Sequence, residues 1–125
     1  MNSGTGHLGG PNQDEAWDVR QTADGGYILA GFTESYGAGS ADFWLVKTDS
    51  NGTELWKKTF GGSGLDEARA VQQTIDGGYV LVGTTDSYGA GNGDFWLVKI
   101  KGGATPYTKL DVGVTSNIPQ QVLMI

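Results

Sequence analysis

The chain has 125 residues, no cysteine and a formal net charge of −6 at pH 7. This length suits a single domain, and the lack of cysteine excludes a disulfide framework and a thiolate metal site. Because the charge is acidic and no basic cluster exists, we expect neither a nucleic-acid partner nor a membrane partner. The sequence contains no long apolar run and no signal-peptide pattern, and these features do not indicate in which cellular compartment the protein acts.

The dominant feature of the sequence is an internal repeat. The segment DGGYILAGFTESYGAGSADFWLVK, which begins at Asp24, returns as DGGYVLVGTTDSYGAGNGDFWLVK from Asp76. The offset is 52 residues, and 24 of 34 positions are identical when residues 14–47 are aligned with residues 66–99. A unit of this size buries too little surface to fold alone, so we expect the two repeats to be parts of one fold.

In chain order, the first repeat divides into four short runs of strand-forming residues. Residues 14–22 precede the turn ADGG, residues 27–33 precede the loop ESYGAGSA, residues 42–48 precede the turn DSNG, and residues 53–60 precede GGSG. Asp-Gly, Asn-Gly and Gly-Gly between such runs indicate hairpins, because tight turns need residues that tolerate positive φ. The pattern predicts four consecutive antiparallel strands per repeat.

Both faces of the predicted sheets are apolar. Along residues 42–48, Phe43 and Leu45 point to one side while Trp44 and Val46 point to the other. The second predicted strand alternates in the same way, so each sheet is expected to be covered on both sides. Four-stranded repeats of this length that stack on copies of themselves are typical of β-propeller blades. The predicted fold class is therefore all-β, with two four-stranded antiparallel blades.

The stretch DFWLVKTDSNGTELWKKTFGGSGLDEARAVQQTIDGGYVLVGTT resembles the repeats of a bacterial and archaeal β-propeller family, the SBBP type. Those repeats combine a D-x-x-x-x-K strand, a D-x-x-G turn, W-x-x-x-x-G-G, D-E-A and G-x-x-x-x-G. The likeness runs from about Gly9 to Lys101. It implies the propeller fold and favours a secreted or cell-surface protein. It implies little about activity, because the shared residues are turn glycines and packing aromatics.

The end of the second repeat departs from the first. After Lys99 the chain reads IKGGATPYTKLDV where TDSNGTELWKKTF is expected. Pro106 and the missing tryptophan predict a degenerate fourth strand, since proline is confined to strand edges. The tail that follows could add a strand to an adjacent blade or stay unstructured. The expected organisation is an N-terminal segment (1–9), a first blade (10–62), a second blade (63–112) and a C-terminal tail (113–125).

Two blades cannot close a ring, because propellers have about four to eight. Both repeats keep the same apolar positions, whereas the end repeats of an open array usually have a polar outer face. We therefore predict that the propeller is completed by homo-oligomerisation, with a trimer preferred over a dimer or tetramer. The bacterial and fungal fucose lectins, with two blades per chain, are similar to this arrangement. The alternative is that the sequence is a fragment of a longer propeller.

An acidic pair opens the first predicted strand of each repeat, Asp14 with Glu15 and Asp66 with Glu67. In a closed ring these carboxylates would form an acidic ring at one mouth of the channel, and such a ring could hold Ca²⁺. The alternative is that they accept backbone N–H groups from the glycine-rich connection before the strand. DSNG at Asp49 is interpreted as a turn, because the later carboxylate of a calcium loop is missing.

Carbohydrate is the preferred ligand class, because each glycine-rich loop carries a tyrosine and ends in an aspartate. The ring could stack on a pyranose while the carboxylate accepts hydroxyls. The alternative is that the tyrosine packs over the blade edge and the aspartate closes its own loop. Trp17, which aligns with Arg69, could line a groove between blades or belong to the core. The candidate ligand-binding residues are thus Tyr36, Asp42, Tyr88, Asp94 and Trp17.

We expect no enzyme. Acid–base catalysis needs two groups in different environments, and a close repeat supplies similar ones. His7 is the one histidine of the sequence and lies outside the repeat, which argues against a Ser-His-Asp triad. The predicted function is a non-catalytic binding or scaffold module, with a glycan and then a protein as ligand. The alternatives are a purely structural propeller and a channel hydrolase or lyase that uses carboxylates.

Overall fold

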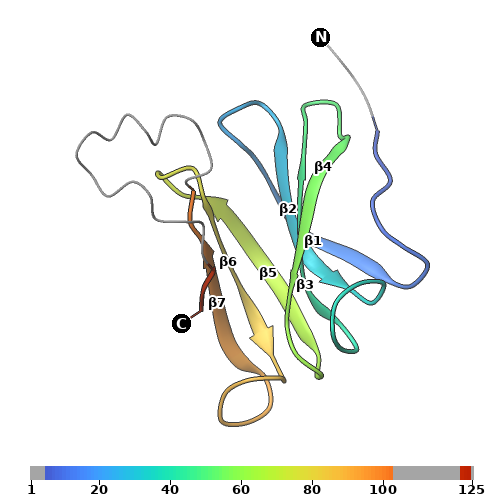
Figure 1. Ribbon diagram of the computed structural model, residues 1–125, viewed down its shortest axis with the longest axis vertical. Coiled ribbons are helices and arrows are strands. Elements are labelled where there is room, and N and C mark those ends of the chain that lie inside the picture. The colour runs from blue at the N-terminus through green and yellow to red at the C-terminus, as the bar shows by residue number, and fades with distance from the viewer. Residues whose placement is uncertain (1–4, 103–121, 125) are drawn as a thin grey trace.

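The computed structural model describes residues 5–102 and 122–124, and this part of the chain forms strands and no helix. The all-β prediction is therefore confirmed. The strands are drawn in Figure 1: β1 (Asp14–Gln21), β2 (Tyr27–Thr33), β3 (Asp42–Thr48), β4 (Glu54–Phe60), β5 (Asp66–Gln73), β6 (Tyr79–Thr85), β7 (Asp94–Ile100) and β8 (Val122–Met124). The described part contains no apolar helix of the length that a membrane crossing requires.

The strands form two antiparallel sheets that follow the sequence repeat. Sheet 1 has the order β1-β2-β3-β4 and sheet 2 the order β5-β6-β7-β8. The registers are equivalent: Gly31 lies opposite Trp44 in sheet 1, as Gly83 lies opposite Trp96 in sheet 2. The four strands expected from the first repeat are thus confirmed.

The outer edge of sheet 2 differs from that of sheet 1. Its fourth strand, β8, has three residues and pairs with β7, so the C-terminal tail supplies the strand at this edge. The prediction about Pro106 falls on residues 103–121, which lie outside the described residues.

The first strand of each sheet contains a β-bulge that the sequence analysis did not predict. The register shifts between Ala16 and Asp18 in β1 and at the equivalent place in β5. Trp17 and Arg69 are the extra residues, so the two bulges occupy the same position of the repeat. A bulge redirects the side chain at its extra residue and bends the strand.

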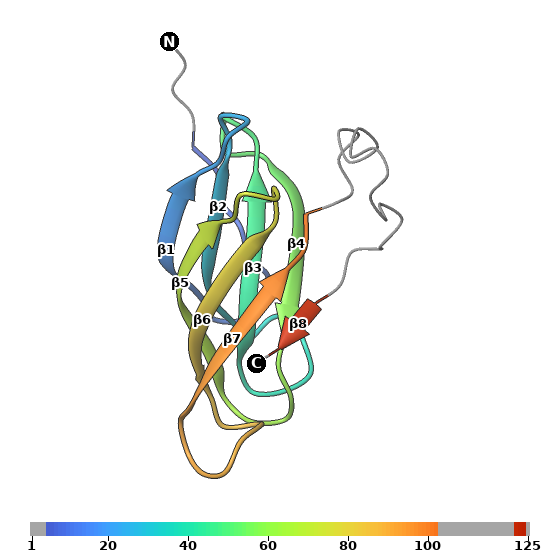
Figure 2. The same cartoon turned by 90° about the vertical axis from the view of Figure 1, so that its left-hand side faces the viewer.

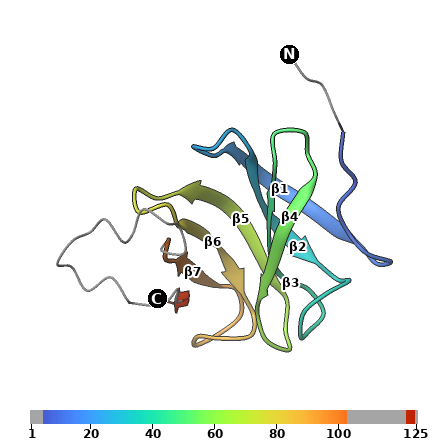
Figure 3. The ribbon, with the colours of Figure 1, turned by 45° about the horizontal axis from the view of Figure 1, so that its top comes forward.

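The two sheets pack face to face, with β5 against β1, β2 and β3 (Figures 2 and 3). Phe43 of β3 meets Trp96 of β7 with their ring centres 4.7 Å apart. Fully burying a side chain such as Phe43 stabilises a fold by about 1.5–3 kcal/mol. The other members of this core are Ile28, Ala30 and Leu45 from sheet 1 and Ala68, Val71, Tyr79, Leu81, Val98 and Ile100 from sheet 2.

Hydrogen bonds fix how the sheets are placed relative to each other. The Asp66 N–H donates to the Ala41 carbonyl at 2.7 Å, and the Val71 N–H donates to the Asp18 carboxylate at 3.0 Å. Apolar packing alone tolerates sliding, whereas these directional bonds are satisfied in a single register. The interface between the two repeats is therefore a specific one.

Lys47 is buried in sheet 1, but its charge is compensated locally. Its ammonium group lies 3.1 Å from Asp24 and donates to the Thr48 carbonyl at 2.9 Å. The Thr22 hydroxyl, the Gly26 N–H and Lys47 together lower the pKa of Asp24 to about 2. This pair holds the first turn of the repeat against β3, and it recurs as Lys99 with Asp76.

Candidate functional site

Each sheet has one face in the core and one face, called the open face, that is turned away from the other sheet. Trp44 and Val46 on the open face of sheet 1 are nevertheless only 6% and 2% exposed, whereas two other positions on the open faces differ sharply in exposure from their counterparts. On sheet 2, Phe95 is 90% exposed, while its counterpart 52 positions earlier, Phe43, is 0% exposed. On sheet 1, Val19 is 53% exposed, while its counterpart Val71 is 2% exposed. At these two positions the same type of side chain is core in one repeat and surface in the other.

The open face of sheet 2 is apolar across its two central strands. Val82 and Leu97 are directly opposite each other on β6 and β7, and Val80 and Phe95 lie on the same side. Phe95 lies near the start of β7, opposite Thr84, and adds an exposed aromatic ring to this apolar face. A contiguous exposed apolar patch is typical of an interaction surface.

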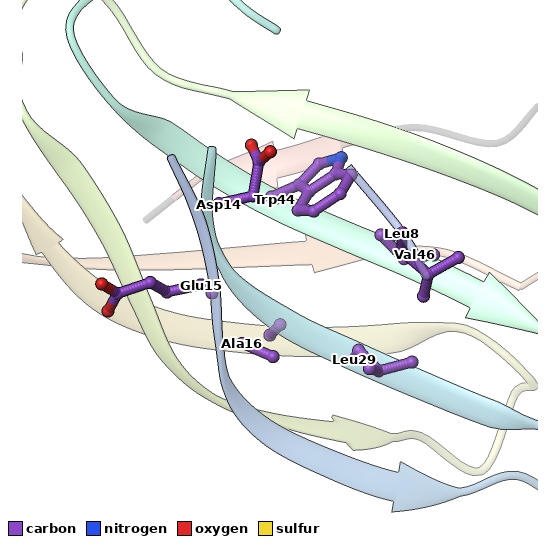
Figure 4. A pocket seen from close by; sticks show the side chains of 9 residues that line it. Leu8, Asp14, Glu15, Ala16, Leu29, Trp44 and Val46 are labelled. Atoms are coloured by element: carbon purple, nitrogen blue, oxygen red, sulfur yellow. The ribbon is translucent and has the colours of Figure 1, made fainter. Parts of the chain in front are cut away.

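The open face of sheet 1 contains a hollow, shown in Figure 4. The counterparts of its apolar lining residues, found 52 positions later, are Ala68, Leu81, Trp96 and Val98 of sheet 2 and Phe60 of β4 in sheet 1, all of which are in or packed against the core. The apolar residues around the sheet 1 hollow are Ala16 of β1, Leu29 of β2, Trp44 and Val46 of β3, and Leu8 of the N-terminal segment.

The two tyrosine loops have the same internal packing. The Tyr36 ring centre lies 5.8 Å from that of Trp44, and its hydroxyl donates to the Gly9 carbonyl at 3.2 Å. The Tyr88 ring lies 5.1 Å from Trp96, and its hydroxyl reaches the carbonyl of Gly61, again at 3.2 Å. Each tyrosine therefore fastens its loop to the connection before the first strand, as the packing alternative describes.

The aspartates at the loop ends accept hydrogen bonds from their own loops. Asp42 accepts the Ala38 N–H, and Asp94 accepts the Gly91 N–H at 3.2 Å. Gly37 has a φ of +98°, and a Cβ there would collide with the Asp42 carboxylate, so the loop requires glycine. Sugar binding by these residues stays a prediction, and Asp94, which is only partly buried, is more accessible than Asp42, which is 1% exposed.

Asp14 and Asp66 hold the glycine-rich connections in place. Asp66 accepts the Gly62 N–H at 3.1 Å, the Ser87 hydroxyl at 2.8 Å and the Thr85 hydroxyl. Asp14 accepts the equivalent groups of its own repeat, including the Gly10 N–H at 3.0 Å. This matches the structural alternative for the acidic pairs.

The remaining members of the acidic pairs contact neighbouring side chains. Glu15 accepts the Gln13 side-chain amide, and Glu67 pairs with Arg69 at 3.0 Å. Among the described residues, no group of three or more histidine, cysteine, aspartate or glutamate side chains could hold a metal ion.

Asp42 and Asp66 form a buried carboxylate pair across the sheet interface. They are 1% and 0% exposed, and a Cβ at Gly61 would contact both. Burial raises the pKa of the Asp42 carboxyl, and the nearby Asp66 charge raises it further. Because both groups are closed off from solvent, a substrate cannot reach them. The sequence analysis missed this pair, because nothing in the sequence relates position 42 of one repeat to position 66 of the next.

Trp17 contacts its own counterpart in the second repeat. The Arg69 guanidinium lies 4.5 Å from the centre of the Trp17 ring, a cation–π contact between the two bulges. Trp17 is 49% exposed and lies outside the buried core. His7 is exposed on the N-terminal segment.

No protein-family model matches the chain, and a search of curated proteins finds no match.

Proposed function

We propose that this chain is a non-catalytic module of the β-propeller type, whose two sheets act as blades and whose role is to assemble with copies of itself into a scaffold. One observation carries the proposal: Phe95 is 90% exposed at the repeat position where Phe43 is 0% exposed. An isolated chain keeps Phe95 and Val19 in water, although the repeat uses the same side chains at Phe43 and Val71 to form core.

Head-to-tail association buries the open face of sheet 2 of one chain against the open face of sheet 1 of the next. The open face of sheet 2 and the open face of sheet 1 are different surfaces, so a contact between them is heterologous and closes only as a ring. Three chains give six blades, within the range in which propellers close, and a trimer is therefore the preferred assembly.

Sedimentation equilibrium tests the proposal. The expected mass is three times the chain mass of 13.1 kDa, with dissociation on dilution. A mass of 13.1 kDa at every concentration up to the millimolar range would contradict it.

Glycan binding at the tyrosine loops is a second proposal, supported by Tyr88, which keeps 47% of its surface exposed. It is less favoured than the scaffold. Assembly that reproduces the contact between the sheets would bury Asp94 as Asp42 is buried, and would remove the carboxylate that a sugar needs. A glycan array probed with the assembled protein separates the two proposals.

A further inference from the structure

We infer that Phe95 of one chain inserts into the sheet 1 hollow of a second copy, in the place that Phe43 takes on sheet 2 within the chain. The inference rests on the proposed self-assembly, and it names the residues that would make the contact.

The chain already contains one example of this contact. Phe43 leaves β3 toward sheet 2 and lies 4.7 Å from Trp96, ring centre to ring centre. Ala68, Leu81 and Val98 belong to the same buried cluster. Sheet 2 thus accepts a phenylalanine on a surface made by one tryptophan and small aliphatic side chains.

Sheet 1 presents the same surface without the phenylalanine. Ala16, Leu29, Trp44 and Val46 line the hollow (Figure 4). They are the counterparts of Ala68, Leu81, Trp96 and Val98, which belong to the same buried cluster as Phe43. Leu8 lies at this hollow, and its counterpart Phe60, on β4, packs against the core between the two sheets. Asp14 and Glu15 also line the hollow, and Trp44 and Val46 are already 6% and 2% exposed, so the hollow is the small opening that remains beside these side chains.

Sheet 2 presents the matching phenylalanine. Phe95 is the counterpart of Phe43, it sits on the well-paired strand β7, and it is 90% exposed. Because the hollow and the phenylalanine face away from each other in one chain, they can meet only between chains.

The polar contacts between the two repeats of one chain also have equivalents between copies. The Ala23 N–H donates to the Gln73 side chain at 2.9 Å within the chain. Their counterparts are the Ile75 N–H of one copy and the Gln21 side chain of the next. Arg69 would likewise meet Trp17 of the next copy, so tryptophan and arginine would alternate around the ring axis.

One hydrogen bond of the internal contact cannot be repeated. Asp18 accepts the Val71 N–H at 3.0 Å, but the counterpart of Asp18 is Ala70. The contact between copies therefore has one charge-assisted bond fewer than the contact within the chain. This difference predicts that Ala70→Asp strengthens assembly, because the new carboxylate would lie opposite the Val19 N–H of the next copy.

Sedimentation of three variants of the full chain tests the inference. Phe95→Asp places a charge in the hollow and is expected to raise the dissociation constant by at least a hundredfold. Ile75→Asp is the matched control: it also exchanges an exposed apolar side chain for a charge, but it keeps the main-chain N–H, which is the only group of Ile75 that the contact would use, and the side chain of its counterpart Ala23 is exposed. This control should assemble like the unchanged chain, and Ala70→Asp should lower the dissociation constant about tenfold.

The outcomes separate this inference from the proposed function. If the unchanged chain assembles and Phe95→Asp assembles equally well, the Phe95 contact is wrong while the scaffold proposal stands. If Ile75→Asp dissociates as much as Phe95→Asp, added charge and not the lost ring explains the result, and the inference is overturned. If the unchanged chain is a monomer throughout, both the scaffold and the contact are wrong.

Discussion

Phe43 and Phe95 occupy one position of the repeat, yet the structure predicts very different stability effects when each is replaced by alanine. Phe43 is 0% exposed and packs against Trp96, so Phe43→Ala removes a whole aromatic ring from the core. Substitutions of this kind cost about 3–5 kcal/mol, through lost burial and the cavity left behind. Since a small domain has about 5–15 kcal/mol of stability, this loss is a large share of the total.

Phe95→Ala should change the stability of the single chain by less than about 0.5 kcal/mol, because its side chain is 90% exposed. Urea unfolding followed by tryptophan fluorescence measures both variants, at a protein concentration low enough to keep the chain monomeric. At high concentration Phe95→Ala should lose stability relative to the unchanged chain, because assembly stabilises the folded state by mass action. Equal losses for the two variants at low concentration would refute the assignment of the buried and open faces.

Three further predictions concern the polar groups and the loops. Asp66→Ala should destabilise the fold by about 2–4 kcal/mol, because it leaves buried hydrogen-bond donors without an acceptor. Asp14 is less buried, so Asp14→Ala should cost about 1 kcal/mol in the same unfolding assay, and a larger loss for Asp14→Ala than for Asp66→Ala would contradict this reasoning. The pKa of Asp42 is raised above the value of 3.8 expected in the unfolded chain, so its ionisation destabilises the folded state as the pH rises. Asp42→Asn should therefore be more favourable at pH 7 than at pH 3, and an equal effect at both would mean that the carboxyl is not perturbed. Replacing Tyr36 and Tyr88 together by alanine should abolish any glycan binding on an array. Loss of the oligomer instead would show that the two rings support the contact between chains and do not bind a sugar.

The sequence predicts the strands well because two local signals agree. Tight-turn residues such as Asp24 and Gly25 fall between runs with alternating apolar side chains, and Gly25 has the positive φ of 90° that the turn requires. Both the turn residues and the alternating runs occur again in the second repeat, 52 positions later. The all-β class and the four strands of sheet 1 follow from these features alone.

The features that were not predicted depend on contacts between the repeats. The bulges at Trp17 and Arg69 leave no local mark in the sequence, and their cation–π contact forms only when β1 and β5 lie side by side. The Asp42–Asp66 pair likewise requires the second sheet to be placed on the first. The alternation of apolar residues shows which side chains share a face of a sheet. It does not show which face of sheet 1 packs against which face of sheet 2.

The loop residues show why composition alone does not separate a sugar site from its packing alternative. Tyrosine, glycine and aspartate suit a sugar site, but they also suit a closed loop in which the aspartate accepts N–H groups and the ring covers a tryptophan. Tyr36 makes both its ring contact and its hydroxyl bond inside the chain. Only three-dimensional placement separates these two uses of the same residues.

A crystal structure of the assembled protein would show directly what covers Phe95. We expect Phe95 to lie on Trp44 of the next chain, with a ring-centre separation close to the 4.7 Å between Phe43 and Trp96. Phe95 exposed to solvent, or covered by a surface other than the sheet 1 hollow, would contradict it.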